Sequence, residues 1–482
     1  MPAPTLYSQL ANHYLHAIEA GTLRCGDRMP SVRTLMERHT VSLSTALQAC
    51  RHLESRGVLE ARPRSGYFVR PRQQAALAPM KEPGAALPDP AQYVGIHQRV
   101  SAIIAKSQQS PVAINLAGAC GAPELYPTEA LQTAMIRALR GNPGLLGRPG
   151  PPTPNGDPGF RAAIAKNALW ARVTLSADEI IVTHGCIEAL NLALRAVTQP
   201  GDVVAVESPT FFGLLQILES LGLRALEIPS SPQTGISLEA LELAAQSYND
   251  IKAVVVVPNL QNPLGSVMPD RHKEDLVHWC EAQRIPLIED DTYSALGDAD
   301  TPLSALKAWD RTGNVIHCAS LHKTLAPGMR LGWISAGKWH ARVEMLKYAQ
   351  SRSNESLPQI AVAEFMASGA YERHLRRLRT SLRRQREQVS AAIASYFPAG
   401  TRLSQPPGGL ALWVEMPGKR SSESLFHAAL QAGIRIAPGL MFSNSKRFDH
   451  YLRISCGSLY SRELEQGIRK LAGLVEALPH TD

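Results

Sequence analysis

Residues 320–333 read SLHKTLAPGMRLGW, a short run in which Lys323 is followed seven residues later by Arg330. The run comes directly after the apolar residues 315–318, which have the length of a buried strand. An amine and a planar guanidinium group would therefore stand together just past the end of a strand. Because a single lysine usually lies on the surface, the meaning of Lys323 depends on the segments around it.

Strand-like runs alternate with helical patterns on both sides of this stretch. Apolar runs rich in β-branched residues occupy 180–182, 203–206, 253–257 and 286–288, and helical spacing marks 188–197, 212–221 and 270–283. Runs that are apolar throughout are typical of strands buried on both faces of a parallel sheet. The pattern predicts an α/β fold with a doubly wound, mainly parallel sheet. We expect a large subdomain over about 112–345 and a smaller α+β subdomain over about 346–482.

Composition places the chain among folded proteins. Its 482 residues are 44% hydrophobic and 19% charged, which predicts two or three folding units. The longest apolar stretches are strand-sized, so no membrane span is expected, and no export signal opens the chain. The seven cysteines are widely spaced, which supports neither disulfides nor a metal site. We expect a cytoplasmic protein.

The first 70 residues differ from the rest in charge and pattern. Residues 1–72 hold ten arginines and no lysine against five acidic residues, within a chain of net charge +8. Helical spacing marks 6–18, 32–39 and 44–56, and two short strands are expected at 59–61 and 67–69. Three helices and a hairpin predict a small winged helix-turn-helix over residues 1–70. The basic charge favours a nucleic-acid partner.

Two stretches rich in proline interrupt the chain. Residues 71–90 carry five prolines and predict an extended linker, with a connector that continues to about residue 111. Residues 141–159 carry six prolines and six glycines, so no regular element is expected there. A long irregular loop inside a compact domain is often functional.

The head is similar to GntR-family regulators over about residues 5–70, through the run GDRMPSVR at 26–33, residues 42–45 and the hairpin 62–69. The resemblance implies that the third helix enters the major groove of double-stranded DNA and that the hairpin reaches the backbone or the minor groove. The contacts it implies are Arg33, Ser42, Ser44, Thr45, Arg62, Arg64, Ser65 and Gly66. Leu43 stands where many members carry a basic residue. Each arginine, taken alone, can also be an ordinary solvated side chain.

The stretch 320–333 resembles the Schiff-base segment of fold-type-I aminotransferases, and the similarity extends over about residues 112–475. It implies pyridoxal 5'-phosphate (PLP) as cofactor, bound to Lys323 as an internal aldimine. Arg330 and Ser320 would then bind the cofactor phosphate.

The same resemblance assigns polar residues after two predicted strands. In IEDDTY, Asp290 would keep the pyridine nitrogen protonated and Tyr293 would bond the phenolic oxygen of the ring. Asp291 is the competing candidate for the pyridine nitrogen. In PNLQNPLG, Asn262 would bond the same phenolic oxygen.

Three further segments complete the implied site. Gly185 and Cys186 open a helix after a strand, where backbone N–H groups can hold phosphate. Cys186 departs from the Ser, Thr or Ala that is common at its position. Phe211 has the place of the aromatic residue that stacks on the ring, and Arg453 that of the arginine that binds a substrate carboxylate.

A GntR-like head joined to an aminotransferase-like body is the layout of the MocR subfamily of bacterial regulators, which the chain resembles. The resemblance implies a homodimer that binds paired half-sites on nucleoid DNA and senses PLP or an amino compound through an external aldimine. The alternative is a working PLP-dependent aminotransferase with an accessory DNA-binding head; against it, 141–159 lacks the tyrosine that such enzymes commonly place there. The seven arginines of 371–386 predict a solvated helix face rather than a second DNA contact.

Overall fold

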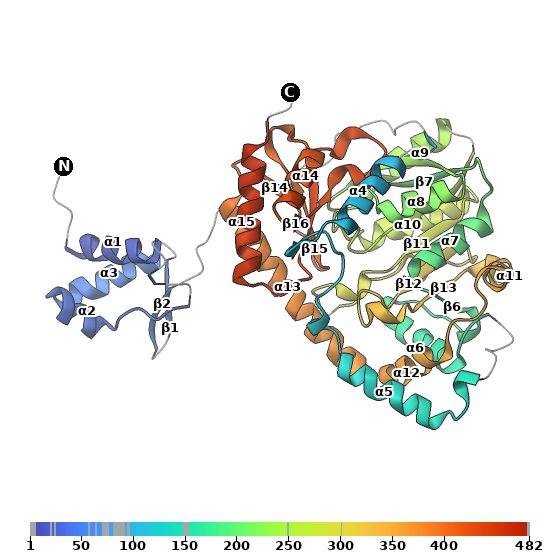
Figure 1. Ribbon diagram of the computed structural model, residues 1–482, viewed down its shortest axis with the longest axis horizontal. Coiled ribbons are helices and arrows are strands. Elements are labelled where there is room, and N and C mark those ends of the chain that lie inside the picture. The colour runs from blue at the N-terminus through green and yellow to red at the C-terminus, as the bar shows by residue number, and fades with distance from the viewer. Residues whose placement is uncertain are drawn as a thin grey trace. The chain divides into compact units, whose positions relative to one another are not determined.

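A computed structural model covers the chain and forms two compact units, residues 1–76 and 77–482. It describes residues 6–19, 22–23, 26–55, 58–62, 65–69, 77–80, 92–93, 97–147, 154–247, 250–299 and 301–479. Figure 1 draws the helices and strands of the first unit in blue. Among the described residues, no helix combines the length and the apolar character that a membrane span requires.

The first unit contains three helices and a hairpin, as predicted. Its helices are α1 (Leu6–Glu19), α2 (Val32–His39) and α3 (Leu43–Ser55), and the antiparallel strands are β1 (Leu59–Arg62) and β2 (Gly66–Val69). A shared apolar core holds them together, with Leu10, Leu35 and Leu53 almost fully buried. The backbone of residues 26–29 pairs with the outer edge of β2, for example from Met29 N to Tyr67 O at 2.9 Å. This extra edge supports the hairpin against the helices.

The second unit is built on a nine-stranded sheet in the order β4-β8-β7-β10-β11-β12-β13-β6. Its end strand is β4 (Gln92–Tyr93), and β9 (Gly235–Ile236) is attached to β8. Its central strands are β8 (Arg224–Ser231), β7 (Val203–Ser208), β10 (Ile251–Val256), β11 (Leu287–Asp290) and β12 (Val315–Ser320), all parallel. On one side β13 (Gly332–Ser335) and β6 (Ile181–Thr183) run antiparallel to their neighbours. The predicted, mainly parallel sheet is confirmed.

Helices cover both faces of this sheet, because alternate strand residues point to opposite sides. On one face, Val204 and Val206 of β7 pack with α7 (Cys186–Val197), α8 (Phe212–Ser220) and α11 (His340–Gln350). On the other face, Val203 and Ala205 pack with α9 (Leu238–Ser247) and α10 (Asp270–Ala282). The sheet is therefore covered by helices on both faces. The ends of its strands are left uncovered by these helices.

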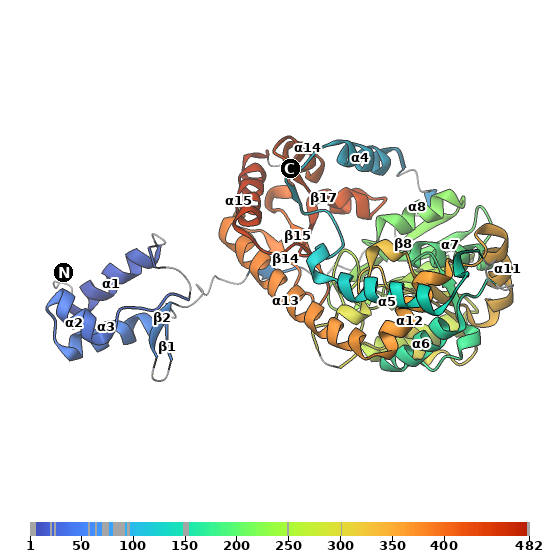
Figure 2. The same ribbon diagram turned by 60° about the horizontal axis from the view of Figure 1, so that its bottom comes forward.

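The smaller subdomain has a sheet in the order β17-β18-β15-β14-β3. Its strands are β17 (Ala437–Pro438), β18 (Tyr451–Ser455), β15 (Ala411–Glu415), β14 (Arg402–Leu403) and β3 (Ala78–Pro79). Helices α14 (Ser422–Gln431) and α15 (Arg462–Ala477) pack on it around Trp413 and Phe426. In Figures 1 and 2 the long helix α13 (Ala370–Tyr396) extends from beside α15 toward α12 (Ser356–Ala367).

The expected subdomain boundary at 345/346 is too early. Val343 of α11 and Val362 of α12 belong to large-subdomain cores, as does Leu375 in the first half of α13, whereas Val389 near its other end belongs to the small-subdomain core. Helix α12 also packs against α5 (Thr128–Gly141) and α6 (Pro158–Ala168). The first half of α13 therefore packs in the large subdomain, and its other end packs in the small subdomain.

The expected linker and connector also need correction. Within 71–111, β3 pairs with β14, β4 (Gln92–Tyr93) pairs with β8, and α4 (His97–Gln109) buries Val100 and Ile103 in the small-subdomain core. Part of the proline-rich segment therefore belongs to the body, because its backbone adds to existing sheet edges.

The loop 141–159 is less irregular than predicted. Residues 145–147 form a single 3₁₀ turn, and Pro158 begins helix α6 behind an Asp157 cap that accepts from Phe160 N at 2.9 Å. Proline suits the first turn of a helix, where its missing N–H has no helical partner in any case. Residues 148–153 lie outside the described part.

Candidate functional site

A cavity of about 390 Å³ opens at the ends of β11 and β12. The predicted residues that line it are Cys186, Phe211, Asn262, Asp290, Tyr293, Ser320, Lys323, Arg330 and Arg453. Eight of them lie at or beyond the ends of strands of the large sheet, whose parallel order brings these segments to one edge. This is the position where open α/β sheets bind ligands. Arg453 instead lies in β18 of the small-subdomain sheet. Nine residues chosen from separate segments thus share one cavity.

The amine of Lys323 lies inside this cavity. Its Nζ is 3.4 Å from Sγ of Cys120, which in turn lies 3.4 Å from Nε2 of His322. Burial lowers the pKa of Lys323, because the charged ammonium loses its water. Burial also lowers the pKa of His322, to about 4, together with the charges of Lys323 and Arg330. A buried amine that loses its proton more readily than usual is a better nucleophile than a surface lysine.

The structure separates the two adjacent aspartates. Asp290 lines the Lys323 cavity and accepts hydrogen bonds from Cys186 Sγ at 3.2 Å and from Thr292 Oγ1 at 2.5 Å. Burial raises its pKa, and these donors oppose that effect. Asp291 lines a different cavity, beside His317. Only Asp290 shares a cavity with Lys323.

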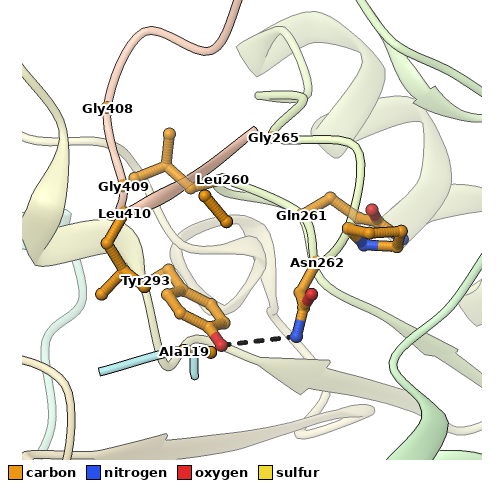
Figure 3. A pocket seen from close by; sticks show the side chains of 11 residues that line it. Ala119, Leu260, Gln261, Asn262, Gly265, Tyr293, Gly408, Gly409 and Leu410 are labelled. Atoms are coloured by element: carbon orange, nitrogen blue, oxygen red, sulfur yellow. Dashed lines mark hydrogen bonds between the residues drawn. The ribbon is translucent and has the colours of Figure 1, made fainter. Parts of the chain in front are cut away.

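Hydrogen bonds connect Tyr293, Asn262 and Arg453 along one wall of the cavity. Asn262 donates from Nδ2 to the Tyr293 hydroxyl at 3.4 Å, the contact drawn in Figure 3. The Asn262 oxygen accepts from the guanidinium of Arg453 at 2.8 Å. Arg453 is buried and donates to the carbonyl of Ala117 at 2.6 Å, and its Nε has no hydrogen-bond partner among the residues that the structure describes. An anionic group in the cavity would meet a guanidinium whose donors are only partly used.

Backbone geometry shapes the opposite wall. Gly185 has φ +88°, and a Cβ there would stand 3.3 Å from the guanidinium of Arg330. Arg330 donates to the carbonyl of His184 at 2.9 Å. Ser320 Oγ accepts from His322 N at 3.1 Å and donates to Leu331 O at 3.2 Å. A glycine, a helix N-terminus, an arginine and a serine hydroxyl therefore converge, as binding of a phosphate requires.

Phe211 lies at the N-terminal end of α8 and lines the cavity. Its ring centroid is 5.1 Å from that of Phe212, and their planes are tilted by 57°. An aromatic face at this wall can stack on a planar ligand.

The predicted DNA contacts at the start of α3 form one small network. Ser42 accepts from Thr45 N at 3.2 Å and so caps α3, while its hydroxyl also contacts Ser44 Oγ at 2.9 Å and Thr45 Oγ1 at 2.8 Å. Ser42 and Ser44 are exposed. Three hydroxyl groups are gathered at one helix N-terminus.

The remaining predicted DNA contacts lie on α2 and the hairpin. Arg33 is 88% exposed and pairs with Glu37 at 3.3 Å. Arg62 pairs with Glu60 at 2.6 Å and lies over the ring of Phe68 at 4.3 Å. Ser65 and Gly66 form the end of the hairpin, with φ +97° at Gly66. Arg64 lies outside the described residues.

The arginine-rich stretch 371–386 lies on α13. Five of its arginines are exposed, namely Arg373, Arg376, Arg377, Arg383 and Arg384. Arg386 is buried and bonds to Asp298 and to the carbonyl of Gly409. The solvated face expected from the sequence accounts for most of these side chains.

Some residues in the cavity or beside it had no signal in the sequence. Cys120 was seen only as one of seven scattered cysteines, and Ala117 and Thr292 lacked any distinguishing pattern. Phe442, whose ring lies 5.2 Å from the guanidinium carbon of Arg453, looked like an ordinary core residue. Their roles depend on contacts between distant segments. Among the described residues, no group of three or more His, Cys, Asp or Glu is arranged to hold a metal ion.

Comparison with known proteins finds a matching protein family for each of the two units. The family of bacterial regulatory proteins called GntR matches residues 6–69, and aminotransferase class I and II matches residues 147–471. The uncharacterized HTH-type transcriptional regulator YjiR of Escherichia coli is 36% identical over 98% of this chain and 99% of its own length. The chain belongs to the MocR subfamily of GntR-type transcription regulators.

Other similar proteins agree with this MocR assignment. The uncharacterized HTH-type transcriptional regulator YdcR of Escherichia coli is also 36% identical, over 98% of this chain and 99% of its own length. Among solved structures, the kynurenine aminotransferase of Pyrococcus horikoshii has a TM-score of 0.72 at 26% identity, covering 78% of this chain and 94% of that one. The α-aminoadipate aminotransferase LysN of Thermus thermophilus, complexed with N-(5'-phosphopyridoxyl)-L-leucine, has a TM-score of 0.70 at 27% identity, covering 78% and 94%.

These findings confirm the winged helix-turn-helix and the fold-type-I body. Membership of the GntR-type regulators implies DNA binding. Fold-type-I aminotransferases and the solved neighbours depend on PLP, the cofactor predicted from the sequence.

Proposed function

We propose that this MocR-type regulator binds DNA in a manner that depends on an amine recognised at a cofactor held by Lys323. One observation carries the proposal: the partly buried Lys323 shares a cavity with a carboxylate, a phenol, an amide and a buried arginine that come from three other segments. This is the set of groups that PLP needs around its ring. The regulator function itself follows from the family.

The residues of the cavity fit PLP. Lys323 would bind its aldehyde carbon, Asp290 would face the ring nitrogen, and Asn262 and Tyr293 would bond its phenolic oxygen. Ser320, Arg330 and the backbone N–H groups after Gly185 would hold the phosphate, where the absence of a Cβ at Gly185 leaves room beside Arg330. Phe211 would stack on the ring. When bound, PLP supplies a carbonyl that condenses with amines and a ring that withdraws electrons.

Arg453 indicates which amines would be recognised. Its guanidinium is buried next to Asn262, and within the described part of the chain its Nε has no partner. An amine that also carries a carboxylate would satisfy Arg453 and take the place of Lys323 on the cofactor. Displacement frees the Lys323 amine beside Cys120, so the charge and contacts of this wall change. The change regulates transcription only if the two states differ in DNA affinity.

We propose that the working unit is a homodimer. A winged helix reads a short half-site, and two heads related by symmetry would read paired half-sites. The contacts proposed are Arg33, Ser42, Ser44, Thr45, Arg62, Arg64, Ser65 and Gly66. Because the target would be chromosomal DNA, the protein would act at the bacterial nucleoid.

The alternative is an enzyme that turns over amino acids. Lys323, Asp290, Tyr293 and Arg453 would allow transamination, but nothing favours this alternative over the sensor. Multiple turnovers with a plain amino acid and a keto acid would favour the enzyme.

The test is Lys323→Ala in the full chain. The wild-type protein is expected to show the visible absorbance band of lysine-bound PLP, to lose it on borohydride treatment, and to change its DNA affinity with at least one member of a panel of amino acids. The DNA probe is a duplex selected from a random library by the wild-type protein. Lys323→Ala is expected to abolish the band and the amino-acid response, with basal DNA affinity within about twofold.

The matched control is Lys166→Ala, which removes an exposed lysine of α6. It should retain the absorbance band and the response. Loss of all DNA binding in a folded Lys323→Ala protein would contradict the proposed division of roles between head and body.

A further inference from the structure

A second, larger cavity lies behind the turn that carries Lys323. Its volume is about 650 Å³, within the range of small-molecule sites. It is lined by the end of α6, the first turns of α13 and the turns after β11 and β12, and it shares Thr292 and Ser320 with the first cavity. None of the proposed cofactor contacts other than Ser320 lines it. The proposed function leaves this space unused.

The walls of the second cavity are largely aromatic and apolar. Trp170, Trp333 and Tyr371 line it together with Leu321 and Leu375. Trp170 is 60% exposed, an unusual exposure for so large an apolar side chain. Aromatic walls of this kind favour a flat apolar ligand.

Acidic groups with unused acceptors also line the cavity. The Asp291 side chain is only 7% exposed, and its buried Oδ1 has no hydrogen-bond partner among the described residues. Within the same part of the chain, the buried Oε2 of Glu372 has no partner either. Burial raises the pKa of Asp291 to about 7, although the charge of nearby His317 opposes this. A buried acceptor that stays unpaired is unfavourable, so a ligand that donates hydrogen bonds would be favoured.

Basic groups line the same cavity from α13. Arg379 donates from Nε to the carbonyl of Ala295 at 2.8 Å. Arg376 is exposed, and among the described residues it forms no ion pair with a carboxylate. A free guanidinium at the mouth can bind a carboxylate in a planar, two-pronged manner.

We propose that this second cavity is a separate binding site for a small aromatic zwitterion, with its amine toward Asp291 and Glu372 and its carboxylate toward Arg376. The aromatic body would lie between Trp170, Trp333 and Tyr371. The site does not depend on the cofactor and is independent of the proposed function.

The location of the site couples it to Lys323. Leu321 and Thr324 line the second cavity and flank Lys323 on the same turn. A ligand there would press on the backbone that positions the amine. Binding is therefore expected to alter the absorbance of lysine-bound PLP without forming a bond to it.

Three ligands with one indole body test the proposal by calorimetry. L-tryptophan carries both charges, tryptamine only the amine, and indole-3-propionate only the acid. The full chain is first treated with borohydride, so that reduction onto Lys323 prevents amine exchange in the first cavity. L-tryptophan is expected to bind once per chain, and each single-charge ligand about tenfold more weakly, as the loss of one charge-assisted hydrogen bond predicts.

Substitutions test which residue binds each charged group of tryptophan. Arg376→Ala should weaken tryptophan binding to the level of tryptamine, and Glu372→Gln with Asp291→Asn should weaken it to the level of indole-3-propionate. Arg384→Ala removes an exposed arginine of α13 that does not line the cavity, and should bind tryptophan as wild type does.

Two results would overturn the site. One is equal affinity for the three ligands, or no binding by any of them. The other is loss of tryptophan binding in Arg453→Lys but not in Arg376→Ala, which would place the ligand in the first cavity. A protein without cofactor would show no absorbance band and would refute the proposed function alone, while the calorimetry still tests the second cavity.

Discussion

Glu207 is a fully buried carboxyl group at the end of β7. Its Oε2 accepts from Val257 N at 2.8 Å, and its Oε1 has no hydrogen-bond partner in the described residues. Burial raises the pKa of Glu207 from 4.5 to about 8, so the folded protein holds a proton that the unfolded chain releases near pH 4.5. An acid with a raised pKa favours the folded state at low pH, and this contribution is lost as pH rises from about 4.5 to 8.

Glu207→Gln is therefore expected to flatten the stability profile in that window. The free energy of unfolding should exceed the wild-type value most clearly near pH 8, since each unit between the two pKa values corresponds to about 1.4 kcal/mol. Urea unfolding at several pH values measures this free energy of unfolding. Glu242→Gln, on the exposed face of α9, should follow the wild-type profile. An unchanged slope in Glu207→Gln would show that Glu207 is ionised in the folded protein.

Helix α3 depends on Ser42 at its N-terminus. Ser42→Ala removes the acceptor of Thr45 N, a loss that typically costs about 1 kcal/mol. Hydrogen exchange of α3 amides in the full chain is expected to accelerate about fivefold, the factor that corresponds to this energy. Ser44→Ala removes an exposed hydroxyl that accepts from no backbone amide, so the exchange rate should stay the same. Equal acceleration in both variants would argue against the cap.

Helix α13 shows that a regular apolar pattern does not tell which hydrophobic core a helix packs against. Its apolar spacing continues over 27 residues, yet Leu375 packs in the large subdomain and Val389 in the small one. Periodicity reports which face of a helix is buried, but not against which core. For this reason the subdomain boundary expected at about residue 345 lies before the change of core, although a helix over 371–386 was expected.

At the scale of the whole molecule, the charge of the head predicts how DNA binding responds to salt. The affinity of the full chain for its selected duplex should fall steeply with salt, because phosphate contacts release counterions. Arg62→Ala is expected to weaken binding about equally on all sequences and to reduce the slope of log affinity against log salt by about one.

The comparison variant is Arg311→Ala, which removes an exposed arginine of the body. Its affinity and slope should equal those of the wild type. If Arg62→Ala binds like Arg311→Ala at every salt concentration, the side chain of Arg62 is engaged only with Glu60 and Phe68 on the head itself.

The sequence by itself determined the order of the two units, the mainly parallel sheet and the segments that supply the cavity. It could do so because strands, helices and their connecting turns are encoded by local patterns. Tertiary structure alone decided that Asp290 and Asp291 line different cavities, since successive residues at a strand end point to opposite sides. It also decided that Cys120 lies beside Lys323, 203 residues away along the chain. Such contacts leave no local pattern, because they arise only when separate strands end at one edge of the sheet.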